Sequence, residues 1–356
     1  MKILTVVGAR PQFIKAAPVS RILRQHHTEF LLHTGQHYDD AMSDLFFRQL
    51  AIPAPDLNLE VGSGRHGAQT GAMLPGIELV AIEQRPDWIL IYGDTNSTLA
   101  GALVGAKLHI RVAHVEAGLR SYDRRMPEEV NRVVADHLSD ILLSPTDAAV
   151  ANLAREGITE GVRMVGDVMY DAFAQNLEVA RRSHGILAEL GLERGGYALL
   201  TVHRAENVDD LERLRTILQG VSEAGIKVVF PVHPRTRAAF GSAGAKPGPN
   251  VMLIDPVGYL EMLVLEENAE KIVTDSGGVQ KEAYFAGRPC ITLRDTTEWN
   301  ETVAAGWNVL VRIDSNAIAS AIREFRPKGE RPNLFGDGHA AERVVDALSA
   351  VKVANP

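Results

Sequence analysis

The chain has 356 residues, of which 46% are hydrophobic and 23% charged, and its 37 basic and 45 acidic side chains give a formal net charge of −8. This composition excludes a disordered, collagenous or coiled-coil protein, and the acidic balance argues against a protein dedicated to binding nucleic acid. The length predicts about two domains.

Short buried strands alternate with amphipathic helices along the first half of the chain. Apolar runs predict strands at residues 2–7, 30–32, 88–92, 111–115 and 141–143. Helical periodicity predicts helices at residues 13–23, 39–50, 68–82, 95–108 and 127–138. No apolar run reaches the roughly 18 residues that cross a bilayer, so no membrane segment is expected.

The same alternation restarts after residues 165–170. Apolar runs predict strands at 197–202, 228–232, 251–254, 272–274, 291–293 and 309–311, with a helix at 211–221. The alternation predicts parallel sheets covered on both faces, so we expect an α/β protein with two doubly wound, Rossmann-like domains facing a central cleft. We place the first domain at 1–167 and the second at 168–338, with a last helix within 339–356 packing back on the first domain.

A glycine pattern typical of dinucleotide binding occurs at Gly62, Gly64 and Gly67. It follows an alternating stretch rather than a buried strand, so a flexible loop is the preferred interpretation and no nicotinamide cofactor is expected. His114 and His137 lack the spacing of metal ligands, and the single cysteine, Cys290, excludes a zinc site built from several thiolates. We therefore expect neither metal nor cofactor, in a protein of the reducing cytoplasm.

Polar side chains follow the predicted strands of the first domain, where open α/β sheets bind ligands. Three carboxylates, Asp94, Glu116 and Glu128, are expected on one rim, where they could supply a general base. Arg10 and Lys15 follow the first strand and predict an anion site. The structural alternatives are a helix N-cap for Asp94, a favourable first-turn position for Glu128, and surface salt bridges for the two cations.

Strands of the second domain are also followed by polar residues. His203 and His233 each follow a strand, which favours catalysis or phosphate binding, although a structural role is the stronger alternative for His233. A helix opens with Ser276-Gly277-Gly278, whose backbone N–H groups predict an anion site. Glu282, one turn further, is placed to accept hydrogen bonds from a ribose. The alternative for this segment is a plain helix start with a capping serine.

Seven motifs occur in one order along the chain: GARPQFIK, YGDTNSTLAG, HVEAGLRS, MPEEVNR, HRAEN, HPRT and TDSGGVQKEA. Together they resemble the non-hydrolysing UDP-N-acetylglucosamine 2-epimerases, over residues 1–345. The resemblance implies a GT-B-like fold, a homodimer, and a UDP-sugar substrate whose acetamido-bearing C2 is inverted from gluco to manno. It also implies elimination of UDP to a 2-acetamidoglucal, followed by re-addition.

The resemblance further implies roles for individual residues. Asp94, Glu116 and Glu128 match the acid–base set, and His203 matches the residue that supports the leaving UDP. The remaining positions, which match binders of the diphosphate, the ribose and the uracil side of UDP, are Arg10, Lys15, His233, Val257, Met262, Ser276, Gly277, Gly278 and Glu282.

Two stretches depart from well-studied bacterial members. Trp299 follows Thr296-Thr297-Glu298, where those members have an arginine. Residues 34–47 also differ from the corresponding stretch of those members, which contributes to a regulatory site in them, so we do not expect that regulation here. The sequence is also similar to sister epimerases that act on UDP-2,3-diacetamido-2,3-dideoxyglucuronic acid. The candidate sugar-specificity residues are Arg65, His66, Arg124, Arg125 and Trp299. A GT-B glycosyltransferase, a UDP-sugar sensor and a hydrolysing epimerase are the remaining alternatives.

Overall fold

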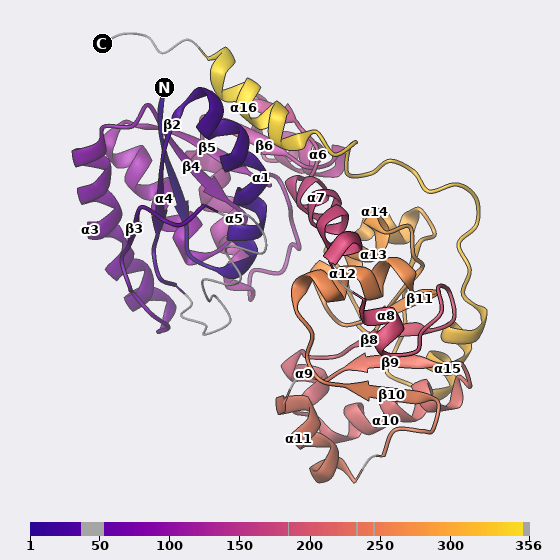
Figure 1. The fold of residues 1–356 in the computed structure, drawn as a ribbon. Coiled ribbons are helices and arrows are strands. Elements are labelled where there is room, and N and C mark those ends of the chain that lie inside the picture. The colour runs from indigo at the N-terminus through magenta and orange to yellow at the C-terminus, as the bar shows by residue number, and fades with distance from the viewer. Residues whose placement is uncertain (37–52, 184, 233, 245, 352–356) are drawn as a thin grey trace. The chain divides into compact units, whose positions relative to one another are not determined.

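The computed structural model describes residues 1–36, 53–183, 185–232, 234–244 and 246–351. The chain divides into two units, the first formed by Met1–Ala172 with Asn333–Pro356 and the second by Phe173–Pro332 (Figure 1). Residues 168–172 and 333–338, which we expected in the second domain, therefore belong to the first unit. The predicted helix at 39–50, and most of the departing stretch 34–47, lie outside the described residues.

The first unit contains a sheet of seven parallel strands in the order β3-β2-β1-β4-β5-β6-β7. The strands are β1 (Lys2–Val7), β2 (Thr28–His33), β3 (Leu57–Asn58), β4 (Trp88–Tyr92), β5 (Arg111–Val115), β6 (Ile141–Ser144) and β7 (Val162–Met164). Its described helices are α1 (Arg10–His26), α3 (His66–Gln84), α4 (Asn96–Leu108), α5 (Pro127–Leu138), α6 (Asp147–Arg155) and α16 (Ala340–Ala350).

The strand order of this sheet reverses between β1 and β4, which pair in parallel register from Ile3–Trp88 to Val6–Ile91. Nearly every residue of the two strands is buried, as expected where helices cover both faces of a sheet. The segments that follow β1 and β4 therefore lie at the topological switch point, where open α/β sheets bind ligands.

Helix α16 brings the end of the described chain back onto the first unit, where it packs against α1 (Figure 1). The carboxylate of Asp171 accepts hydrogen bonds from the backbone N–H groups of Ala340 (3.1 Å) and Ala341 (2.7 Å), which satisfies donors that the first turn of a helix leaves without partners. At the other end of α16, His27 Nε2 and Ser349 Oγ lie 2.9 Å apart.

The second unit contains a sheet of six parallel strands in the order β10-β9-β8-β11-β12-β13. The strands are β8 (Ala198–Thr201), β9 (Val228–Pro231), β10 (Val251–Ile254), β11 (Lys271–Thr274), β12 (Cys290–Thr292) and β13 (Asn308–Leu310). Its described helices are α7 (Val168–Ser183), which begins in the first unit, α8 (Ile186–Glu189), α9 (Ala205–Val208), α10 (Leu211–Glu223), α11 (Pro234–Ala243), α12 (Tyr259–Asn268), α13 (Gly277–Phe285), α14 (Asn300–Ala304) and α15 (Ser315–Glu324).

This topology confirms the prediction of two doubly wound α/β domains with parallel sheets. The order of the second sheet reverses between β8 and β11, so the segments after these strands lie at its switch point. The short edge strands β3 and β7 were not predicted, because their two and three residues are too few to show a period. Within the described residues, no helix has the length and apolar character needed to cross a membrane.

A buried carboxyl group in the second unit makes stability depend on pH. Glu266 of α12 is fully buried, and its carboxyl group lies beside that of Glu282. Burial, and then the neighbouring carboxyl of Glu282, raise the pKa of Glu266 well above its ordinary value. The folded protein therefore keeps this proton at pH values where the unfolded chain has released it.

Because the unfolded chain loses the proton above about pH 4.3, stability should fall as the pH rises from there towards the raised folded-state pKa. We expect Glu266→Gln to remove this fall, which amounts to at most about 1.4 kcal/mol per pH unit. Urea unfolding of the full-length protein between pH 5 and 8, followed in the second unit, measures how the free energy of unfolding changes with pH. Glu267→Gln, at a neighbouring carboxylate paired with Arg181, is the matched control and should keep the wild-type slope. An unchanged slope in Glu266→Gln would contradict the prediction.

Candidate functional site

Two charged side chains meet at the switch point of the first unit. Glu116 follows β5, and its carboxylate forms an ion pair with the ammonium of Lys15, which lies in the second turn of α1. The backbone of Glu116 has φ +73°, a left-handed conformation that is unfavourable for a residue other than glycine. Backbone strain of this kind is concentrated at functional sites, and here it directs a carboxylate that is 8% exposed towards Lys15.

Gly93, which follows β4, leaves room for this ion pair. A Cβ atom at Gly93 would lie 3.2 Å from Glu116 Oε2 and 3.3 Å from Lys15 Nζ, and the residue has φ +61°. A side chain here would therefore press on both charged groups and strain the backbone.

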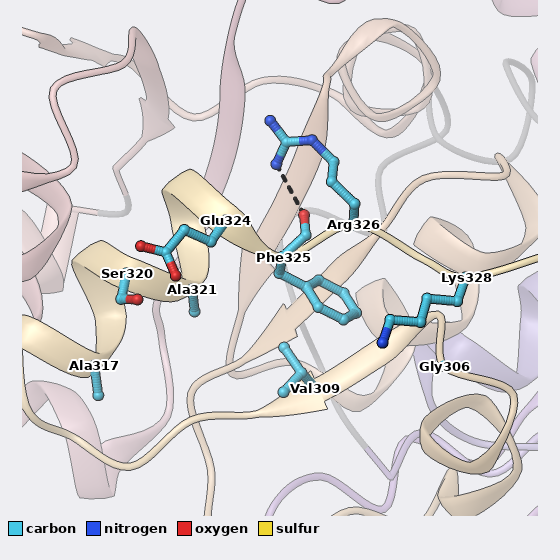
Figure 2. A pocket seen from close by; sticks show the side chains of 9 residues that line it. All are labelled: Gly306, Val309, Ala317, Ser320, Ala321, Glu324, Phe325, Arg326 and Lys328. Atoms are coloured by element: carbon cyan, nitrogen blue, oxygen red, sulfur yellow. Dashed lines mark hydrogen bonds between the residues drawn. The ribbon is translucent and has the colours of Figure 1, made fainter.

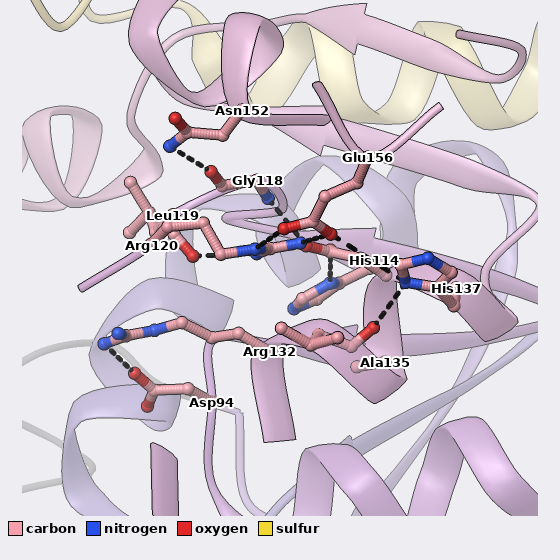
Figure 3. Close-up of polar contacts among 12 residues, drawn as sticks. Asp94, His114, Gly118, Leu119, Arg120, Arg132, Ala135, His137, Asn152 and Glu156 are labelled. Carbon is pink, nitrogen blue, oxygen red and sulfur yellow. Dashed lines mark hydrogen bonds and ion pairs between the residues drawn. The ribbon is translucent and has the colours of Figure 1, made fainter. Parts of the chain in front are cut away.

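Asp94, the next residue, is held by α5 (Figure 3). Arg132 donates a hydrogen bond to Asp94 Oδ2 at 2.5 Å and another to Glu129 Oε2 at 3.0 Å, while Asn131 Nδ2 donates to the backbone carbonyl of Asp94 at 2.9 Å. The alternative that Asp94 caps α4 is wrong, because the N-cap is Thr95. The side chain of Asp94 is thus fixed by a guanidinium and remains partly exposed.

A buried network of hydrogen bonds and ion pairs lies near these residues (Figure 3). His114 Nε2 is 2.7 Å from the carbonyl oxygen of Gly93, and His114 Nδ1 is 2.7 Å from Asp136 Oδ1. Arg120 pairs with Asp136 at 2.7 Å and with Glu156 at 2.7 Å. Burial opposes the charge of Asp136, but the hydrogen bond from His114 and the charge of Arg120 outweigh it and lower the pKa of that carboxyl. The network therefore fixes the turn after β4 through the carbonyl of Gly93.

Sequence reasoning missed most of this network. It considered His114 only as a metal ligand, and it assigned no role to Arg120, Arg132 or Asp136. The available signal was the presence of Arg120 and Arg132 within two of the quoted motifs, HVEAGLRS and MPEEVNR. Within the described part of the chain, no cluster of three or more His, Cys, Asp or Glu side chains could hold a metal ion.

The two glutamates of the first turn of α5 differ in their surroundings. Glu129 is buried and accepts hydrogen bonds from the N–H groups of Ser121 and Tyr122, each at 2.8 Å. Although burial opposes its charge, these bonds lower the pKa of Glu129. Glu128 is exposed, and no hydrogen bond or ion pair within the described residues joins it to Asp94 or Glu116.

The candidate specificity residues of the first unit lie on two segments. Arg65 is the N-cap of α3 and His66 its first residue, so the predicted flexible loop ends before Gly67. His66 Nδ1 lies 3.2 Å from Asn96 Nδ2 and lines a cavity of about 510 Å³ formed by α3, α4 and α5. Arg124 and Arg125 are exposed before α5, and Arg125 pairs with Asp123 at 2.7 Å.

In the second unit, a buried aspartate arranges the segment after β8. Asp275 is fully buried and accepts hydrogen bonds from the backbone N–H groups of His203 (3.2 Å) and Arg204 (3.1 Å) and from Asn207 Nδ2 (3.0 Å). His203 Nδ1 also lies 3.3 Å from Asp275 Oδ1, and the histidine side chain is 56% exposed. The backbone of His203 is therefore held by Asp275, while its imidazole ring reaches solvent. Sequence reasoning assigned no role to Asp275, although it lies in the TDSGG motif.

The segment after β11 starts helix α13 at Gly277, with Ser276 as the N-cap. Ser276 Oγ accepts a hydrogen bond from the N–H of Val279 at 3.4 Å, so the capping role weighed as an alternative is present beside the predicted anion site. Glu282 lies in the second turn of α13 and is buried. Val257 and Met262 lie before and within the first turns of α12, while His233 lies outside the described residues.

Trp299 is 5% exposed, and its indole Nε1–H donates to the carbonyl of Gly277 at 2.9 Å. A cavity of this unit, about 560 Å³ between β13 and α15, is lined by Val309, Phe325 and Lys328 among others (Figure 2). None of the residues that line it is a predicted site residue. Of the predicted residues of this unit, His203 follows β8, and Ser276, Gly277 and Gly278 follow β11.

Comparisons with known proteins agree with the motifs. The family model described as UDP-N-acetylglucosamine 2-epimerase matches residues 21–349. A Methanococcus maripaludis "UDP-N-acetylglucosamine 2-epimerase homolog" is 53% identical over 98% of this chain and 99% of the relative. The Pseudomonas aeruginosa "UDP-2,3-diacetamido-2,3-dideoxy-D-glucuronate 2-epimerase" is 47% identical, also over 98% and 99% of the two chains.

A solved structure has the same fold along nearly the whole length. It is the Methanocaldococcus jannaschii UDP-GlcNAc 2-epimerase in complex with UDP-GlcNAc and UDP, which is 46% identical and superposes with a TM-score of 0.86 over 98% of this chain and 99% of that chain. The GT-B-like fold implied by the sequence resemblance is thereby confirmed. The chain is therefore an epimerase and belongs to the UDP-N-acetylglucosamine 2-epimerase family.

Proposed function

We propose that this enzyme interconverts UDP-N-acetylglucosamine and UDP-N-acetylmannosamine by eliminating and re-adding UDP. The observation that supports it best is the set of cation–carboxylate pairs at the strand ends of the first unit, Lys15 with Glu116 and Arg132 with Asp94. The Methanocaldococcus jannaschii relative, whose structure was solved with UDP-GlcNAc and UDP, supports the substrate.

The chemistry explains why carboxylates are needed. The C2 proton of the sugar has no neighbouring carbonyl, so its direct removal is hard. In the elimination route a base takes the C2 proton, the electrons of the C2–H bond form the C1–C2 double bond, and the C1–O bond breaks to release UDP. UDP then adds back to C1 of the 2-acetamidoglucal while a proton is delivered to the opposite face of C2. This route requires no oxidation at C3 and no nicotinamide.

Within this proposal, Asp94, Glu116 and Glu128 form the acid–base set. Glu116 and Asp94 are each held by one cationic side chain, so their oxygens are oriented before substrate binds. Preorganised acid–base groups of this kind commonly supply 10²–10⁴-fold each, by order of magnitude. The exposure of Glu128 makes it the least constrained member of the set.

UDP binding is assigned to the remaining candidates. The N–H groups at the start of α13, at Ser276, Gly277 and Gly278, suit the diphosphate, since a helix N-terminus favours anions. His203, whose ring is half exposed and anchored by Asp275, is assigned to the leaving UDP. The further assignments are Arg10 and Lys15 to the diphosphate, Glu282 to the ribose, and Val257 and Met262 to the uracil side.

The second candidate substrate is UDP-2,3-diacetamido-2,3-dideoxyglucuronic acid. It is favoured by the Pseudomonas aeruginosa relative, named for that sugar, at 47% identity. The exposed guanidinium of Arg124 and the exposed Arg65 and His66 are then candidates to contact the carboxylate of the sugar.

Incubation in deuterated water tests the reaction. We expect UDP-N-acetylglucosamine to yield the manno epimer with deuterium at C2, because the base exchanges its proton with solvent before re-addition. Proton NMR follows the loss of the signal of the hydrogen on C2, and UDP-2,3-diacetamido-2,3-dideoxyglucuronic acid is treated in the same way in a parallel sample. Product that kept its original C2 hydrogen would exclude elimination. Turnover of the second sugar alone would replace the proposed substrate and leave the mechanism standing.

Substitution of the carboxylates tests the acid–base set. We expect Asp94→Asn and Glu116→Gln to lower kcat by about 10²–10⁴-fold while the Kd for UDP changes less than threefold, since these groups act on C2. Glu128→Gln in the same assay shows whether the exposed member takes part. Glu160→Gln, an exposed carboxylate of the same unit, is the control and should keep full activity. An active Asp94→Asn, Glu116→Gln double variant would remove both residues from the mechanism.

We also propose that the enzyme is a homodimer that uses the outer face of α3. Leu79 and Ile82, three positions apart on this helix, are 58% and 56% exposed. Large apolar side chains gathered on a surface are typical of an interface.

Leu79→Glu with Ile82→Glu should therefore convert the protein from twice its chain mass of 38.7 kDa to a monomer, because two carboxylates would be buried without partners. Light scattering coupled to size exclusion measures the mass. Leu253→Glu, at an exposed leucine of the second unit, is the control and should stay dimeric. A double variant that remained a dimer would place the interface elsewhere.

A further inference from the structure

The first turn of α13 presents backbone N–H groups that the helix itself cannot satisfy. Gly277 and Gly278 are the first two helical residues, and their amides donate no hydrogen bond to another described residue. In the proposed function, on which this inference rests, these amides bind the diphosphate of UDP. Two consecutive glycines allow wide backbone rotation, so a ligand that needs both N–H groups aligned would lose affinity unless something held them.

Trp299 is placed to hold one of these peptide groups. Its indole Nε1–H donates to the carbonyl oxygen of Gly277 at 2.9 Å. The Gly277 carbonyl and the Gly278 N–H belong to the same planar, trans peptide unit, so fixing the oxygen on one side fixes the direction of the N–H on the other. A donor on the carbonyl also polarises the peptide and strengthens its N–H as a donor.

The indole is itself held from several sides. Its ring lies under the ammonium of Lys281, which is 4.3 Å from the ring centroid, and Lys281 is 3% exposed. The backbone N–H of Trp299 donates to Thr297 Oγ1 at 3.1 Å, and Thr297 Oγ1 donates to Gln280 Oε1 of α13 at 2.6 Å. The loop after β12 is thus joined to α13 at two points, through Trp299 and through Thr297.

The neighbouring side chain leaves no room at Gly277. A Cβ atom there would collide with Glu298 Oε1, whose carboxylate accepts a hydrogen bond from Arg294 at 2.9 Å. A side chain at Gly277 would therefore displace the Glu298 carboxylate and disturb its ion pair with Arg294, whereas glycine leaves this backbone without stiffness from a side chain. The indole supplies that stiffness from the adjacent loop.

We propose that Trp299 is a positioning residue for diphosphate binding, acting through the Gly277–Gly278 peptide. With 5% of its surface exposed and the one polar atom of its side chain bonded to Gly277, it acts without touching the sugar. Trp299 therefore sets the affinity for the anionic part of the substrate, whichever sugar the enzyme accepts.

The test compares UDP with uridine, which lacks the diphosphate, in full-length Trp299→Phe. Phenylalanine keeps an aromatic face for Lys281 and removes only the indole N–H. We expect the Kd for UDP to rise about three- to tenfold, as loss of one hydrogen bond predicts, while the Kd for uridine changes less than twofold. Calorimetry measures UDP and NMR titration measures the weaker uridine. Lys281→Met, which leaves the indole in place, should raise the Kd for UDP by a smaller factor. This variant replaces Trp299→Phe as the test if Trp299→Phe does not fold.

Trp307 provides the matched control. Its indole N–H is buried and has no hydrogen-bond partner among the described residues, so Trp307→Phe should leave both dissociation constants at wild-type values. UDP binding unchanged by Trp299→Phe, or UDP and uridine weakened equally, would overturn the proposal. Wild-type enzyme that bound no UDP would instead overturn the proposed function, and wild-type epimerisation measured in parallel separates the two results.

Discussion

Opposite charges held together at the carboxyl ends of β1, β4 and β5 are the interaction on which the first unit depends. Lys15 meets Glu116, and Arg132 meets Asp94, in positions where a lone buried charge would be costly. Each partner therefore fixes the other. The His114–Asp136–Arg120 network holds the turn after β4, so the carbonyl of Gly93 cannot move without breaking a buried hydrogen bond.

In the second unit, a buried carboxylate rather than a set of ion pairs fixes the segment that follows β8. Asp275 is a buried carboxylate that accepts hydrogen bonds from backbone N–H groups and from the side-chain amide of Asn207. The ring of His203 lies beside the same carboxylate, with Nδ1 3.3 Å from Asp275 Oδ1. A protein of net charge −8 can thus present sites for anions, since local N–H groups and a few cations outweigh the distant surplus of acid.

Sequence reasoning could place the fold and the residues at strand ends because both follow from local patterns. A run such as ILIY predicts a buried strand, and Asp94 follows it two positions later. The partners were harder to find, since Arg132 lies 38 positions from Asp94 and Asp275 lies 72 positions from His203. No period or motif encodes such a pair, because only the packing of one element on another brings the atoms together. The role we assign to Trp299 required the direction of a single indole N–H.

The left-handed backbone of Glu116 costs stability at a residue to which we assign an acid–base role. Glycine would relieve the strain at φ +73°, yet it would remove the carboxylate that pairs with Lys15. Stabilising substitutions in enzymes commonly reduce activity at such strained sites. Glycine would also leave the partly buried ammonium of Lys15 without this counter-charge, so the relief of strain and the loss of the ion pair oppose each other in the stability of the folded chain, and a search for more thermostable variants has to screen activity together with stability.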